Sequence, residues 1–202
     1  MQTPESTSSA MSTARLEAFS DAVIAIIITI MVLELHVPHS AKLSALRPLV
    51  PVFLSYVLSF VYLGIYWNNH HHLLQRTASV SGGILWANLH LLFWLSLFPF
   101  ATAWWGENHF AKTPTAVYGV VLLLAAIAYY ILQSVIVARE GRDSALARAL
   151  GSDWKGKISP ILYVSGIALS FVNRWIGVGL YVLVAVIWLV PDRRLERDFG
   201  AA

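Results

Sequence analysis

Polar side chains that could do chemistry interrupt the long apolar stretches of this sequence at three places. Asp21 lies six residues after Arg15, and Asn88 lies in a later apolar stretch. Between them, His71 belongs to the segment Trp67-Asn68-Asn69-His70-His71-His72. An ionisable group in lipid is costly unless it is paired, so it marks a structural network or a functional site. Because histidine titrates near neutral pH, proton handling by Asp21 and His71 is one chemistry open to them.

The three consecutive histidines, His70 to His72, suggest a metal site, but their spacing argues against one. Successive residues of a helix point about 100° apart, so three in a row cannot bind one ion. The H-E-x-x-H arrangement of zinc hydrolases is absent, and the chain has no cysteine. We therefore expect no metal site.

Sequence motifs of common enzymes and of the potassium-channel carbonyl filter are also absent. The chain has no G-x-S-x-G, no Walker A sequence and no G-x-G-x-x-G. These absences leave a membrane enzyme without positive support, and we expect neither an enzyme nor a cofactor. The filter sequence T-V-G-Y-G is missing as well, which excludes a conventional carbonyl filter on this chain.

The composition places these residues in a membrane protein. Hydrophobic residues make up 57% of the chain and charged residues 12%, whereas soluble domains average about 45–50% and about 25%. A membrane helix needs about 20 mostly apolar residues. The sequence predicts an all-α membrane protein with six transmembrane helices, the last two joined by a tight hairpin at Asn173-Arg174, near residues 16–36, 47–74, 83–106, 114–138, 157–173 and 175–191.

The basic residues set the expected orientation. If the N-terminus is inside, most Lys and Arg fall on the inner side, concentrated in the loop 139–157 and after residue 192. We therefore expect a multi-pass protein of the cell membrane with cytoplasmic N- and C-termini. The net charge of +3 is a topology signal, and we expect no nucleic-acid partner. The predicted organisation is a disordered tail at 1–14, a membrane domain at 15–192 and a cytoplasmic tail at 193–202.

Helical geometry divides the first span into two faces. At about 100° per residue, one apolar stripe is formed by Phe19, Ile26, Ile30, Leu33 and Val37, and Thr29 lies about 60° from Ile26. Asp21 lies about 140° from Ile26, so it points to nearly the opposite side. The stripe and the carboxylate therefore cannot serve the same surface. Either face could line a pore, and the pattern alone favours ordinary helix packing for the stripe.

Polar residues at a similar depth on three predicted helices should bond one another, because lipid offers them no water. The expected inter-helix network joins the first three spans through Arg15, Ser20, Asp21, Trp67, Asn68, His71 and Asn88. The sequence leaves open which of His70, His71 and His72 joins it. Its favoured role is to hold the first helix against the second and third.

These residues also resemble a known family. Arg15-x-x-x-Phe19-Ser20-Asp21-Ala22, with the Ile- and Thr-rich stretch that follows, is similar to the first-helix signature of the transmembrane protein 175 family of lysosomal-type potassium channels. The resemblance extends to Trp67-Asn68-Asn69-His70-His71 and to Asn88 with Leu97-Phe98-Pro99. A chain with one six-span repeat resembles the prokaryotic type, which implies a homotetramer in membrane lipid with the first helices around a central pore.

The resemblance also implies roles for the first helix. It places the narrowest ring of a potassium-selective pore at Ile26, further pore layers at Ile30 and Leu33, and a selectivity-associated residue at Thr29. Arg15, Ser20 and Asp21 would then anchor the helix by the inter-helix network. The implied function is passive permeation of potassium ions past a hydrophobic constriction. The alternative is a proton-permeable channel or proton-coupled carrier that uses Asp21 and His71.

Overall fold

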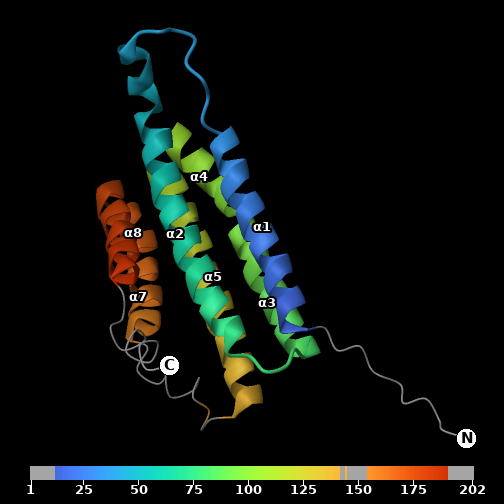
Figure 1. Cartoon of the computed structure of the whole chain (residues 1–202). Coiled ribbons are helices and arrows are strands. Elements are labelled where there is room, and N and C mark those ends of the chain that lie inside the picture. The colour runs from blue at the N-terminus through green and yellow to red at the C-terminus, as the bar shows by residue number, and fades with distance from the viewer. Residues whose placement is uncertain (1–11, 142–143, 145–153, 191–202) are drawn as a thin grey trace, which may run out of the picture.

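Helices make up every element in the part of the chain that the structure describes. The computed structural model describes residues 12–141, 144 and 154–190. Figure 1 shows its elements, which follow one another as α1 (Thr13–Leu33), η1 (Leu43–Leu49), α2 (Val50–Gln75), α3 (Gly82–Ser96), α4 (Phe98–Glu107), α5 (Lys112–Glu140), α7 (Trp154–Ser170) and α8 (Arg174–Leu189). The predicted tails lie almost entirely outside the described residues, although α1 begins at Thr13, two residues before the predicted start of the membrane domain.

Four helical stretches are long and apolar enough to cross a membrane: Thr13–Leu33, Leu43–Gln75, Gly82–Glu107 and Lys112–Glu140. They match the first four predicted spans. The fifth and sixth predicted spans correspond to α7 and α8, which have 17 and 16 residues and form a shorter hairpin beside the long helices. The described helices thus confirm an all-α membrane protein, and six helical rods fit the predicted six spans.

Proline explains why the third span consists of two helices. α3 ends at Ser96 and α4 begins at Phe98, with Pro99 in its first turn. Proline has no N–H to donate and its ring clashes with the preceding turn, so it is tolerated where a helix begins. The prediction of one span at 83–106 therefore has the right extent, but the chain changes direction at Leu97.

The α7–α8 hairpin confirms the predicted break at Asn173-Arg174. The side chain of Asn173 accepts a hydrogen bond from the backbone N–H of Trp175 (3.0 Å) and so caps the start of α8. The two helices approach closely because Gly177 faces Gly166. A Cβ atom added at Gly177 would lie 2.9 Å from the carbonyl oxygen of Gly166.

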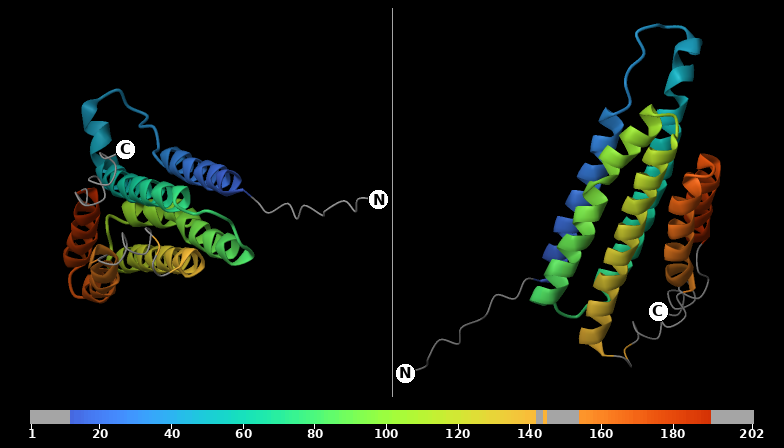
Figure 2. Two further views of the ribbon diagram at one scale, coloured as in Figure 1. Left: turned by 60° about the horizontal axis from the view of Figure 1, so that its bottom comes forward. Right: turned by 180° about the vertical axis from the view of Figure 1, so that it is seen from behind.

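α1 occupies one side of the bundle and the α7–α8 hairpin the other, with α2 and α5 between them (Figures 1 and 2). α1 packs against α2, α3 and α4, whereas α7 packs against α5 and α8. The core between these layers is apolar and includes the fully buried Leu63, Leu91 and Leu122. α1 therefore has one face held by the bundle and one face left for lipid or for another chain.

Candidate pore-lining helix and its polar anchor

α1 is defined by a cap at its start and by an apolar sequence along its length. Ser12 caps the helix by accepting a hydrogen bond from the backbone N–H of Arg15 (3.4 Å). The residues that α1 buries recur every three or four positions, as one face of a helix requires: Leu16, Ser20, Ile24, Ile27 and Met31. This face holds α1 against α2, α3 and α4.

The predicted stripe lies on an exposed face of α1, about 110° around the helix axis from the buried face. Ile26 is 56% exposed and Leu33 78% exposed, and Phe19 and Ile30 are exposed on the same stripe. Thr29 is exposed beside them, and its hydroxyl donates a hydrogen bond to the carbonyl oxygen of Ile26 (2.9 Å). The five side chains therefore form a continuous, mostly apolar surface that the described part of the chain leaves uncovered.

A buried chain of hydrogen bonds joins α1 to α3 and α2. The Ser20 hydroxyl donates to the carbonyl oxygen of Leu16 (2.8 Å) and accepts from the Asn88 amide (2.9 Å). The amide oxygen of Asn88 lies 2.7 Å from Nε2 of His70. Because that oxygen can only accept, Nε2 of His70 carries the proton. Ser20, Asn88 and His70 are all fully buried, so this network is shielded from water.

A second set of polar contacts runs along the more exposed edge between α1 and α2. The indole N–H of Trp67 donates to the Asp21 carboxylate (3.0 Å), and Nδ1 of His71 lies 2.6 Å from the Glu17 carboxylate. The amide of Gln75 lies 2.9 Å from Nε2 of His71. The Asp21–Trp67 and Glu17–His71 contacts are four residues apart on each helix. The shift runs toward the start of α1 and toward the end of α2, as antiparallel helices require. The contacts therefore fix the register of α1 on α2.

The structure brings together most, but not all, of the predicted network. Ser20 and Asn88 form one part, and Asp21, Trp67 and His71 belong to the other. The side chains of Arg15 and Asn68 are exposed, and neither forms a hydrogen bond or ion pair to another described residue.

Glu17 and Gln75 did not enter the predicted network, and His70 was one of the three histidines among which the prediction left the choice open. A signal for His70 exists in the sequence, because it lies four residues after Tyr66 on the buried stripe of α2. Glu17 lies four residues before Asp21, and Gln75 lies four residues after His71. These two spacings place each pair on one face of its helix.

The C-terminal half of α1 is held by weaker polar contacts. The sulfur of Met31 lies 3.9 Å from the hydroxyl of Thr102 on α4. That hydroxyl is 2.7 Å from the hydroxyl of Ser59, which is 2.9 Å from the hydroxyl of Tyr118. The charged and amide groups of the anchor are therefore concentrated toward the start of α1, while hydroxyls and a thioether serve its other half.

The consecutive histidines point to different neighbours, since His70 contacts α3 and His71 contacts α1. Among the described residues, no three His, Cys, Asp or Glu side chains converge as a metal site would require. The arrangement can fix the position of α1 and present its apolar stripe. Within the part of the chain that the structure describes, it contains no cluster of acidic side chains that could bind one ion together.

Long apolar helices, polar networks between them and an uncovered apolar stripe on α1 define a multi-pass α-helical membrane protein. The profile of the family described as endosomal/lysosomal potassium channel TMEM175 matches residues 15–99, which run from the first turn of α1 through α2 and α3 to the start of α4. A potassium channel of a Chryseobacterium species is 58% identical over 188 residues, which cover 93% of this chain and 98% of that protein. The chain therefore belongs to the TMEM175 family, as the sequence resemblance predicted.

Two further comparisons extend the likeness over most of the chain. A potassium channel of Chamaesiphon minutus is 30% identical over 188 residues, covering 86% of this chain and 92% of that protein. The crystal structure of a lysosomal potassium-selective channel TMEM175 homolog from Chamaesiphon minutus matches with a TM-score of 0.75 and 29% identity. That match covers 88% of this chain and 96% of the solved chain. The likeness therefore includes the α7–α8 side of the bundle as well as the signature helices.

Proposed function

We propose that this protein is a potassium-selective channel of the cell membrane, with cytoplasmic termini and the exposed stripe of α1 lining its pore. The observation that carries the proposal is the division of α1 into two faces. One face is fixed to α2, α3 and α4 by packing and buried hydrogen bonds, and the other presents Ile26, Ile30 and Leu33 to the outside. The relatives named as potassium channels supply the identity of the ion.

The pore requires several copies of the chain, because one α1 helix cannot surround an ion path. We propose a homotetramer in which four α1 helices surround one axis, as the family resemblance implies. Closed cyclic symmetry is the usual arrangement of homo-oligomers. The position of α1 at the side of the bundle supports this assembly, since its exposed stripe is free to meet the stripes of other copies.

A ring of four Ile26 side chains would form a hydrophobic constriction. Such a ring blocks ions by excluding water and conducts when it widens. Ile30 and Leu33 lie four and seven residues further along the same stripe and would form the next layers. Thr29 borders the ring, and its hydroxyl and the carbonyl of Ile26 place oxygen atoms beside the constriction. Replacement of lost hydration by these oxygens is the role we propose for Thr29.

Single-channel recording in lipid bilayers tests the pore assignment. We expect Ile26→Ala to widen the constriction and raise conductance, and Ile26→Asn to hydrate it and increase the open fraction. Val32→Ala is the matched control, because Val32 is also exposed but lies about 120° from Ile26 around the helix axis. Unchanged conductance and selectivity in both Ile26 variants would remove this residue from the pore.

The same bilayers distinguish potassium permeation from proton transport. Glu17 and His71 form a short carboxylate–imidazole contact near Asp21, which is the arrangement that favours proton handling. A potassium pore lined by the stripe predicts a reversal potential that follows the potassium gradient and not the pH gradient. A current that follows the pH gradient and disappears in Asp21→Asn would support the proton-permeable alternative instead.

A further inference from the structure

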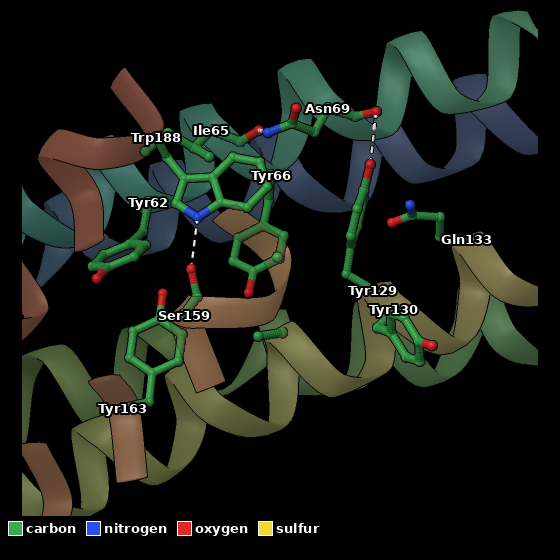
Figure 3. Close-up of a pocket in the computed structure, with 12 residues that line it drawn as sticks. Tyr62, Ile65, Tyr66, Asn69, Tyr129, Tyr130, Gln133, Ser159, Tyr163 and Trp188 are labelled. Atoms are coloured by element: carbon green, nitrogen blue, oxygen red, sulfur yellow. Dashed lines mark hydrogen bonds between the residues drawn. The ribbon is translucent and has the colours of Figure 1, made fainter. Parts of the chain in front are cut away.

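A cavity opens between α2, α5 and the α7–α8 hairpin, and none of its lining residues comes from α1 (Figure 3). The part of the cavity that its walls enclose measures about 50 Å³, and the empty space is about 540 Å³ when the open mouth is included. Because one water molecule needs about 10–15 Å³ of enclosed volume, the enclosed part holds a few small groups of a ligand, and the rest of the ligand lies in the mouth. Half of the twelve lining residues are aromatic, five tyrosines and one tryptophan: Tyr62, Tyr66, Tyr129, Tyr130, Tyr163 and Trp188.

Hydrogen bonds hold parts of this wall in place. The indole N–H of Trp188 donates to the hydroxyl of Ser159 (3.0 Å), which ties α8 to α7. The hydroxyl of Tyr129 donates to the carbonyl oxygen of Asn69 (3.1 Å), which ties α5 to α2. Rings fixed in this way form a site before a ligand arrives, which lowers the entropic cost of binding.

Two largely buried residues of the cavity carry polar groups that have no hydrogen-bond partner among the described residues. The side chains of Tyr66 and Gln133 are 8% and 9% exposed, and neither the hydroxyl nor the amide forms a hydrogen bond within the described residues. Figure 3 shows Tyr66 projecting from α2 and Gln133 from α5 into the space between these helices. A buried polar group without a partner is costly, and most of all in lipid. A ligand that donates or accepts a hydrogen bond would satisfy either group.

The lining residues also determine the charge of the ligand. Among the residues that the structure describes, the lining includes no Asp, Glu, Lys, Arg or His. An ion would lose its hydration in this cavity without meeting an opposite charge. An uncharged ligand carries no such cost, and its apolar part can pack against the aromatic rings.

The depth of the cavity indicates the route of entry. Asn69 lies six residues before the end of α2, and Gln133 lies seven residues before the end of α5. At 1.5 Å per residue, both are about 10 Å inside the helix ends. A ligand at this depth partitions from the lipid rather than from bulk water.

We propose that this cavity binds a small uncharged amphiphile, with an apolar ring or short chain that packs on the tyrosines and a hydroxyl or carbonyl group that bonds Tyr66 or Gln133. The site is separate from the α1 stripe. Its occupation is therefore independent of whether α1 lines a pore.

Photolabelling of the purified full-length chain in lipid nanodiscs tests this site. The probe is an alkylphenol that carries a diazirine group, and the labelled positions are read by mass spectrometry. We expect adducts on α2, α5 and α7 next to the cavity, and we expect excess 4-butylphenol to remove them. Labelling spread over lipid-facing positions and unaffected by the competitor would overturn the proposal, because the cavity would then hold only water.

Three variants separate the cavity from unspecific partition into lipid. Ala126→Leu places a larger side chain in the cavity and should abolish specific labelling. Tyr66→Phe and Gln133→Leu each remove one unpaired polar group, and one of them should weaken competition by 4-butylphenol about threefold to tenfold.

Tyr56→Phe is the matched control, since Tyr56 lies on α2 but does not line the cavity. Size-exclusion elution and far-UV circular dichroism check that each variant folds. Unchanged labelling in folded Ala126→Leu would overturn the site. Equal competition by the cationic 4-butylphenyl-trimethylammonium would overturn its preference for an uncharged ligand.

Discussion

Asn88 on α3 links α1 to α2, and both the nitrogen and the oxygen of its side-chain amide form hydrogen bonds. Its amide nitrogen donates to Ser20 on α1, and its amide oxygen accepts from His70 on α2. Replacement by leucine preserves approximate volume but leaves the Nε2–H of His70 unpaired in a buried place. The expected cost is about 1–3 kcal/mol of stability. The midpoint of thermal unfolding in detergent should therefore fall by several degrees in Asn88→Leu.

Asn68→Leu is the control for this prediction. Asn68 is exposed on α2 and forms no side-chain hydrogen bond to another described residue, so its replacement should change stability by less than about 0.5 kcal/mol. Equal shifts in the two variants would show that the buried network does not stabilise the bundle. A direct partner test is His70→Leu, which should lower stability less in the Asn88→Leu background than in the unmodified chain.

The sequence predicted which helices would exchange polar contacts, but not the partner of each side chain. Ser20, Asp21, Trp67 and Asn88 were placed by depth alone, and depth was sufficient for them. Depth was not sufficient to place the consecutive histidines, because neighbouring residues on a helix point about 100° apart. Only the rotation of α2, set by its packing against several helices, decides that His70 faces Asn88.

At the scale of elements, the α7–α8 hairpin depends on one close approach. A Cβ atom at Gly177 would collide with the hydroxyl of Ser170 and lie 2.9 Å from the backbone oxygen of Gly166. Because backbone cannot move aside cheaply, Gly177→Ala should separate the two helices and lower the thermal midpoint. A cost of about 1–3 kcal/mol is typical of overpacking.

Gly179→Ala is a matched control two residues away on the same helix. No atom lies within 4 Å of a Cβ added there, and alanine favours a helix over glycine by up to about 1 kcal/mol. Gly179→Ala should therefore leave the thermal midpoint unchanged or raise it. Equal destabilisation by both substitutions would show that the close approach of α7 and α8 does not limit stability.

The elements themselves were largely predictable because long apolar runs have few alternatives in lipid. All six predicted spans coincide with helical rods, and Asn173 begins α8 as the polar break suggested. The division of the third span into α3 and α4 was harder to predict from the sequence. Pro99 signals a disturbance, but whether it bends one helix or starts a second depends on the packing of Leu97 and Phe98 against the rest of the bundle.

At the scale of the whole molecule, α1 and the α7–α8 hairpin are two possible contacts with another chain. Both present exposed apolar side chains, among them Ile26 on α1 and Ile161 on α7. Exposure to lipid and exposure to a neighbouring subunit look alike in a single chain. The sequence could not separate them either, because an apolar stripe serves both purposes.

The absence of cysteine from the chain makes this choice testable. A single cysteine at Ile26 would lie close to its copies if four α1 helices surround an axis. Disulfides form only when Cα atoms are about 4.4–6.8 Å apart, so oxidation of Ile26→Cys in membranes should give covalent dimers on a denaturing gel. Ile161→Cys, which is at least as exposed but lies on the far side of the bundle, should stay monomeric.

Native mass spectrometry of the unmodified protein completes the test. The proposed assembly predicts a species of four times the 22.4 kDa of one chain. Efficient cross-linking at Ile161 with none at Ile26 would place the subunit contact on the α7–α8 side and leave the α1 stripe facing lipid. Cross-linking at Ile26 together with the fourfold mass would instead put the constriction on the symmetry axis. Each subunit would then supply one Ile26 side chain to the ring, so one substitution would change the width of the constriction at four positions at once.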